Sequence, residues 1–123
     1  MTARDFRRIA LGMEGAVEAS HMNHPDFRVN GKIFATIHTD NAQGMVKLTP
    51  EQQERFMREH PGMFHPAAGA WGRQGSTMVA FAHGRDDVVG EAMTLAWQNL
   101  ARAAKNESGI RRAKAARIGR TRK

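Results

Sequence analysis

Cysteine is absent from the chain, which excludes disulfide bonds and metal sites built on thiolates. No run of about 18 apolar residues occurs either, so the sequence offers no candidate for a transmembrane helix. The N-terminal residues lack the apolar segment of a secretory signal peptide. From these absences we expect a cytoplasmic protein with no membrane partner.

Motifs for covalent catalysis and phosphate binding are also missing. The chain has only three serines, Ser20, Ser76 and Ser108. None of them lies in a Gly-x-Ser-x-Gly elbow. The glycines of Gly69–Gly75 lack a following Gly-Lys-Ser/Thr and are interpreted as a flexible hairpin tip. Asp86 and Asp87 stand at a predicted helix start, where capping explains them. We therefore expect no enzymatic activity and no cofactor.

Six histidines raise the question of a metal site. His21 and His24 form the tightest pair, and His60 and His65 form another. Zinc requires three or four ligands, and the sequence places no third ligand near His21 and His24, which are read as flanking a proline turn. We interpret the histidines as surface or turn residues and expect no metal.

The basic residues are unevenly distributed. The formal net charge is +7, yet residues 101–123 contain nine basic residues and a single acidic one, Glu107. Residues 1–100 contain ten basic and eleven acidic residues. The body of the protein is therefore close to neutral, and the basic character belongs to the end of the chain.

The clearest turn signal is Asn30-Gly31, which stands between two runs of β-branched and aromatic residues. Both residues tolerate positive φ, so the pattern predicts a two-residue β-hairpin turn. That turn sets the opposing pairs Val29 and Lys32, Arg28 and Ile33, and Phe27 and Phe34. One face of the hairpin is then expected to carry Phe27, Val29, Lys32, Phe34 and Thr36.

The other elements follow from hydrophobic periodicity and from capping residues. Helices are predicted over residues 3–13, from Pro50 to His60, and from Asp86 to about Ala104. Further strands are predicted over residues 17–22, 45–48, 63–68 and 76–83, with a turn at residues 23–26. The order α-β-β-β-β-α-β-β-α predicts a two-layer α+β fold in which an antiparallel sheet is covered on one face by helices.

The hairpin also resembles that of a known family. Residues 27–35, Phe-Arg-Val-x-Gly-Lys-Ile-Phe-Ala, are similar to the signature hairpin of the MmcQ/YjbR family, to which DNA binding is attributed from shape. The segment of residues 10–18, the turn of residues 61–64 and the last amphipathic helix follow in family order. The resemblance implies a CyaY-like or secretion-chaperone-like two-layer fold over residues 1–107, with two hairpins that contact a duplex as wings. It implies no reaction.

The first function that the sequence leaves open is weak DNA binding without strong sequence preference. The hairpins would contribute Arg28, Lys32, Lys47 and Arg73, and Trp71 would either stack on a base or fill the edge of the core. Residues 108–123 are expected to form a disordered basic arm. Its phosphate-binding candidates are Arg111, Arg112, Lys114, Arg117, Arg120, Arg122 and Lys123.

The second function left open is protein interaction. In this case the hairpin face that carries Phe27, Val29 and Phe34 docks a protein partner or a second copy of the chain in a homodimer. The basic tail then has no role beyond solubility.

Overall fold

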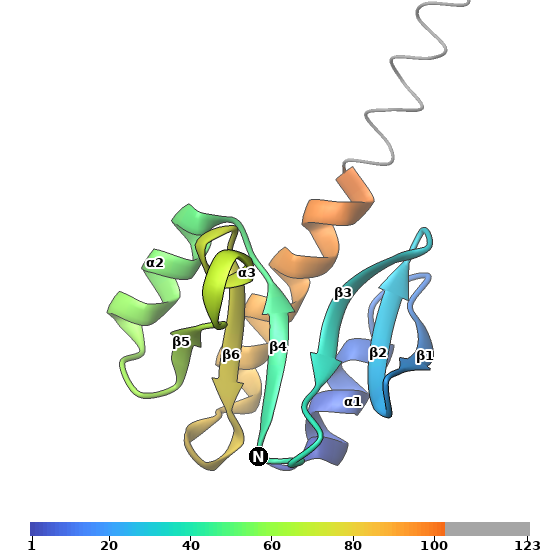
Figure 1. The fold of residues 1–123 in the computed structure, drawn as a ribbon, viewed down its shortest axis with the longest axis horizontal. Coiled ribbons are helices and arrows are strands. Elements are labelled where there is room, and N and C mark those ends of the chain that lie inside the picture. The colour runs from blue at the N-terminus through green and yellow to red at the C-terminus, as the bar shows by residue number, and fades with distance from the viewer. Residues whose placement is uncertain (103–123) are drawn as a thin grey trace, which may run out of the picture.

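The structure is a computed structural model that describes residues 1–102. Its six-stranded antiparallel sheet has the strand order β1-β2-β3-β4-β6-β5 (Figure 1). The strands are β1 (Val17–His21), β2 (His24–Val29), β3 (Lys32–Ile37), β4 (Gln43–Lys47), β5 (Phe64–Pro66) and β6 (Ser76–Ala80). The helices are α1 (Ala3–Leu11), α2 (Pro50–Glu59), α3 (Gly69–Arg73), the short 3-10 helix η1 (Phe81–His83) and helix 86–102. The predicted α+β class and element order are confirmed.

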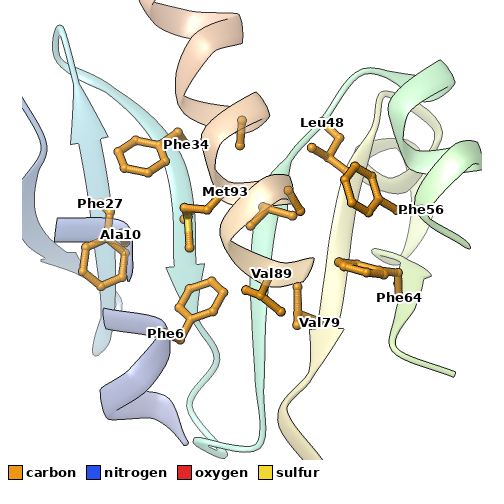
Figure 2. Packing of buried hydrophobic residues seen from close by; sticks show 14 of the residues in the cluster. Phe6, Ala10, Phe27, Phe34, Leu48, Phe56, Phe64, Val79, Val89 and Met93 are labelled. Atoms are coloured by element: carbon orange, nitrogen blue, oxygen red, sulfur yellow. The ribbon is translucent and has the colours of Figure 1, made fainter. Parts of the chain in front are cut away.

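One hydrophobic core lies between the sheet and the helices α1, α2 and 86–102 (Figure 2). The largest side chains that are fully buried come from both layers: Phe6, Phe27, Phe34, Phe56, Ile37, Met93, Val46, Val79 and Val89. Phe27, Val29 and Phe34 all belong to this core. The expectation that these three residues dock a partner is therefore wrong, because the protein's own helices cover them.

The predicted boundary between a domain and a tail at residue 107 lies outside the described residues.

Capping boxes start the first two helices, as their sequences predict. The hydroxyl of Thr2 accepts from the backbone N–H of Asp5, and the carboxylate of Asp5 accepts from the N–H of Thr2. The hydrogen bonds that the backbone N–H and the hydroxyl of Thr2 donate to the Asp5 carboxylate hold the pKa of Asp5 below its usual value. Thr49 and Gln52 form the same arrangement at α2, with Pro50 in the first turn.

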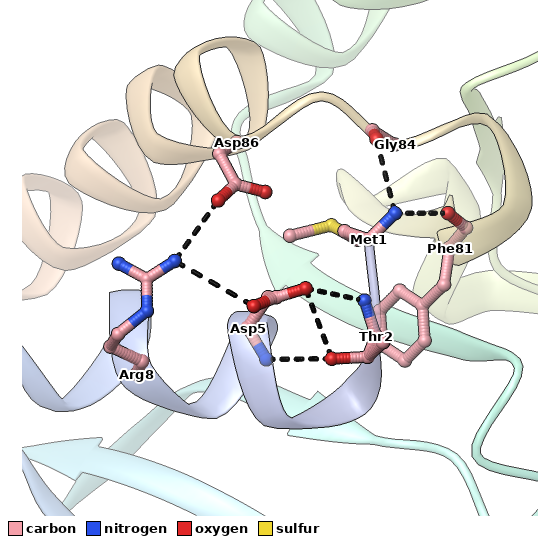
Figure 3. A network of polar contacts seen from close by, with 7 residues as sticks. All are labelled: Met1, Thr2, Asp5, Arg8, Phe81, Gly84 and Asp86. Carbon is pink, nitrogen blue, oxygen red and sulfur yellow. Dashed lines mark hydrogen bonds and ion pairs between the residues drawn. The ribbon is translucent and has the colours of Figure 1, made fainter.

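The N-terminus and α1 are joined to the start of helix 86–102 (Figure 3). Arg8 Nη2 lies 3.0 Å from a carboxylate oxygen of Asp86. The N-terminal ammonium group of Met1 donates to the carbonyls of Phe81, at 3.0 Å, and Gly84, at 3.4 Å. These contacts hold the N-terminus and α1 against the segment that enters helix 86–102.

The predicted hairpin turn is present, with φ angles of 54° at Asn30 and 77° at Gly31. Arg28 pairs with Ile33 and Val29 pairs with Lys32, as expected. The agreement between the predicted and the observed register covers only these two residue pairs next to the turn.

A β-bulge in β3 changes the rest of the register. Phe27 pairs with Ala35 instead of Phe34, so that Phe34 is the extra residue. Phe34, Ala35 and Ile37 are all buried, and Thr36 moves to the opposite face from the one predicted. The bulge lets two consecutive side chains enter the core, which a regular alternating strand cannot do.

A second two-residue turn joins β1 to β2. Met22 and Asn23 have φ angles of 50° and 66°, and His21 pairs with His24 across the turn. The predicted turn at residues 23–26 is therefore wrong, since His24, Pro25 and Asp26 belong to β2. Met22 has no particular preference for positive φ, so this turn carries no strong local signal.

Other boundaries differ by a few residues. α1 ends at Leu11 rather than at residue 13, and β6 ends at Ala80, where η1 follows. Residues 69–73, predicted to be a loop, form α3. Within residues 1–102, no helix has both the length and the apolar character needed to cross a bilayer.

The structure predicts a stabilising substitution at Gly90, which lies inside helix 86–102. A Cβ atom added there meets no atom within 4 Å. Because glycine is less favourable than alanine in a helix interior, Gly90→Ala is expected to raise the free energy of unfolding by roughly 0.5–1 kcal/mol. Urea unfolding measures the change. A loss of stability would contradict the open space around Gly90.

Candidate nucleic-acid interface

The sheet face turned away from α1 and helix 86–102 carries a hollow with a volume of ≈ 710 Å³. We call this face the open face. The strand register produces its central row, because Asp26 pairs with Thr36, Thr36 with Met45, Met45 with Met78 and Met78 with His65. α3 lies over one end of this face (Figure 1). A hollow of this volume is within the range of small-ligand sites, about 300–1,000 Å³.

The middle of the hollow is apolar and its border is polar. Ile33, Met45 and Met78 supply the main apolar side chains. The polar residues that line it are His21, His24, Thr36, His38, Gln43, Lys47, His65 and Ser76. No aspartate or glutamate is among the described residues that line the hollow. Its lining therefore favours a ligand that combines an apolar part with a negative charge.

Three histidines are grouped at the end of the hollow near the β1–β2 turn. The rings of His21 and His24 are stacked, with centroids 5.6 Å apart and an interplanar angle of 10°. The ring of His38 meets that of His24 edge-on at 6.1 Å. Within residues 1–102, no group of three or more histidine, aspartate or glutamate side chains is arranged to hold a metal ion.

Asp26 is a fully buried carboxylate beneath this histidine group, with 0% of its surface exposed. Arg28 donates to it twice, from Nε to Oδ1 at 2.7 Å and from Nη2 to Oδ2 at 3.1 Å. His21 Nδ1 lies 3.0 Å from Oδ2. The hydrogen bond from Arg28 is the main cause that lowers the pKa of Asp26, against the opposing effect of burial, and His21 lowers it further. In return, Asp26 raises the pKa of Arg28.

Lys47 and Trp71 meet at the other end of the hollow. The ammonium nitrogen of Lys47 lies 5.9 Å from the centroid of the Trp71 ring, which is the geometry of a cation–π contact. Trp71 belongs to α3 and is 65% exposed. Of the two roles that the sequence leaves open for Trp71, filling the edge of the core is therefore excluded.

Most arginines on the helical side are paired with acidic residues. Arg7 contacts Glu18 and Arg8 contacts Asp86, each at 3.0 Å, and Arg55 pairs with both Glu59 and Glu91. By contrast, Lys32, Lys47 and Arg73 form no ion pair with another described residue.

The structure separates the four predicted contact residues of the body. Lys47 lines the open face, and exposed Arg73 ends α3 two residues after Trp71. Arg28 lies on the same face against Asp26. Lys32 is exposed beside the hairpin turn and pairs with Val29, a core residue, so it belongs to the helical side. The tail candidates lie outside the described residues: Arg111, Arg112, Lys114, Arg117, Arg120, Arg122 and Lys123.

The histidine group is the feature that the sequence analysis missed. Its only local signal is that the pair His21 and His24 is separated by two residues, as in a tight hairpin. Since neither Met22 nor Asn23 is glycine, this signal is weak. The adjacent prolyl residue, Pro25, favoured the mistaken turn.

Comparisons with known proteins agree with this fold. A family model described as YjbR matches residues 11–99. The crystal structure of Deinococcus radiodurans protein DR2400, which carries the domain DUF419, aligns with a TM-score of 0.66 over 80% of this chain and 78% of that chain. The two sequences are 18% identical, so the likeness shows the fold alone. No curated protein matches the chain. Because the matched range contains the hairpin and spans most of the chain, the protein belongs to the YjbR family, as its hairpin sequence implied.

Proposed function

We propose that this YjbR-family protein is a non-enzymatic DNA-binding protein that binds weakly and without strong sequence preference. The observation that carries the proposal is the combination of Lys47 and Arg73, which lack an ion-pair partner among the described residues, with an exposed tryptophan between them in the sequence. Cations beside an exposed aromatic ring are a common means of binding nucleic acid without reading its sequence.

The C-terminal segment supplies the long-range attraction in this proposal. Residues 103–123 contain eight basic residues and one acidic residue, whereas residues 1–102 contain eleven of each. Phosphate contacts from such a segment add affinity that depends on salt but not on sequence. The open face then contacts the same strand, and because contacts to phosphates carry no sequence information, binding stays without strong sequence preference.

One contact joins the last turns of the described part of helix 86–102 to the backbone of Lys47. Asn99, close to the end of helix 86–102, donates from its side-chain amide to the backbone carbonyl of Lys47 at 3.3 Å. The same amide group donates to Gln52 at 2.9 Å. The chain therefore leaves the described part of the protein close to Lys47, which suits joint binding of one ligand.

A full-length variant tests the role of the basic segment. In it, the seven candidates Arg111, Arg112, Lys114, Arg117, Arg120, Arg122 and Lys123 are replaced by glutamine. Affinity for random DNA is expected to fall at least about tenfold at low salt, because counterion release is lost. The slope of log affinity against log salt should flatten by roughly 0.9 for each duplex phosphate contact removed. Fluorescence anisotropy with labelled DNA measures both quantities.

The matched control removes positive charge from the helical side. Arg58 is exposed and pairs only with Glu54 of its own helix among the described residues, at 3.6 Å. Arg58→Gln should therefore leave DNA affinity nearly unchanged. If the unmodified protein shows no binding to DNA at low salt, the proposed function is wrong. If the variant with seven substitutions binds DNA with unchanged affinity, the tail does not contribute to DNA binding.

A further inference from the structure

We infer that the open face receives an unpaired nucleobase that stacks on Trp71, so that the protein prefers single-stranded to double-stranded nucleic acid. This inference rests on the proposed function and names the form of nucleic acid that the site takes. It follows from the exposure of Trp71, the shape and lining of the hollow, and the position of Lys47.

The exposure of Trp71 has no structural explanation within its own fold. Tryptophan carries a large apolar surface and is normally well buried, yet 65% of Trp71 is exposed, among the highest values for a large hydrophobic residue in residues 1–102. The other tryptophan, Trp97, is partly buried and donates from its indole nitrogen to the carbonyl of Glu14 at 2.7 Å. Trp71 therefore offers a flat ring to a ligand, and Trp97 does not.

The hollow is suited to an unstacked nucleobase. Its floor of Ile33, Met45 and Met78 is apolar, like the face of a nucleobase, and Trp71 stands at its border. In a duplex the base faces are covered by neighbouring bases, and only the edges reach a protein surface. A single strand can turn its bases outward onto an aromatic side chain. Stacking on Trp71 is therefore available to an unpaired base and not to a base inside a duplex.

Lys47 is positioned to bind the phosphate of the nucleotide whose base stacks on Trp71. Its ammonium group lies over the Trp71 ring, at 5.9 Å from the centroid, and no acidic side chain lines the hollow among the described residues. A strand whose base lies against Trp71 brings its phosphate within reach of a cation that forms no ion pair within residues 1–102. The charge and the apolar surface are thus complementary to a nucleotide within a single strand.

The test compares Trp71→Ala with the unmodified full-length protein. The probes are a labelled oligothymidylate of about ten nucleotides and a duplex of equal length, since single-strand sites span roughly 4–16 nucleotides. Loss of one stacked base costs about 1–3 kcal/mol, so single-strand affinity should fall about fivefold or more. Duplex affinity should stay within about twofold. Trp71→Phe should restore most of the single-strand affinity, because it keeps an aromatic ring.

Trp97→Phe provides the matched control and a second readout. In this background Trp71 is the remaining tryptophan, and its fluorescence should be quenched by oligothymidylate but not by the duplex. If Trp71→Ala weakens both forms equally, or neither, the stacking inference is wrong, although DNA binding itself stands. Binding to neither probe by the unmodified protein overturns the proposed function. If light scattering shows that the protein self-associates, and quenching by oligothymidylate is lost because of it, the inference is also wrong.

Discussion

Arg28→Ala is expected to lower the free energy of unfolding by clearly more than the ~0.5 kcal/mol typical of a surface substitution, because it leaves a buried carboxylate without its main partner. Asp26 has no exposed surface and receives two hydrogen bonds from Arg28. His21 supplies the remaining contact from a side chain that is 46% exposed. Urea unfolding at pH 7, where Asp26 is ionised, measures the loss. A change below about 0.5 kcal/mol would be typical of a surface residue and would contradict this assignment.

The double variant Asp26→Ala, Arg28→Ala is the control. It removes the buried charge together with its partner, so it should be more stable than Arg28→Ala alone. A double-mutant cycle with the two single variants gives the coupling energy between the residues. A coupling near zero would mean that the hydrogen bonds from Arg28 do not stabilise the fold.

The same pair produces a dependence of stability on pH. The pKa of Asp26 is lowered in the folded protein from its ordinary value of 3.8. The stabilisation is therefore fully present above about pH 3.8 and is lost as the pH falls through the lower native pKa. In Arg28→Ala the main cause of this lowering is gone while burial remains, so the pKa of Asp26 rises. The stability difference between the two proteins should consequently shrink in acid.

Gly75→Ala is expected to cost at least about 3 kcal/mol, because two independent effects act at this position. Gly75 has a φ of +112°, a conformation that residues with a Cβ rarely adopt. An added Cβ would also lie 2.0 Å from the carbonyl oxygen of Leu48. That backbone cannot move easily, since the N–H of Leu48 donates to the carbonyl of Gly75 at 3.2 Å. Thermal unfolding measures the effect.

Gly62→Ala separates the two contributions. Gly62 also has a positive φ, +88°, but an added Cβ there meets no atom within 4 Å. It should lose only about 1–2 kcal/mol, the cost of the left-handed conformation. Equal losses in the two variants would show that the contact with Leu48 contributes nothing.

The elements that can be predicted from the sequence are those whose signals are local. The turn at Asn30-Gly31 and the capping boxes of Thr2 and Thr49 each depend on residues within a few positions of one another. Helical spacing and alternation of apolar residues then indicate most of the buried faces, β3 beyond its bulge excepted, and this is enough for the fold class. The concentration of basic residues beyond residue 101 is likewise a property of the sequence alone.

The arrangement of the open face, by contrast, depends on contacts between elements that are distant in the sequence. The bulge at Phe34 exists because the core accepts two consecutive side chains there, a choice that depends on the helices packed against β3. The β1–β2 turn uses Met22 and Asn23 in a conformation that neither requires, and strand pairing selects it. The histidine group, and the contact of Lys47 with Trp71, join residues distant in sequence. Local preferences cannot specify such contacts, because their free energy appears only when the sheet has formed and its neighbours are in place.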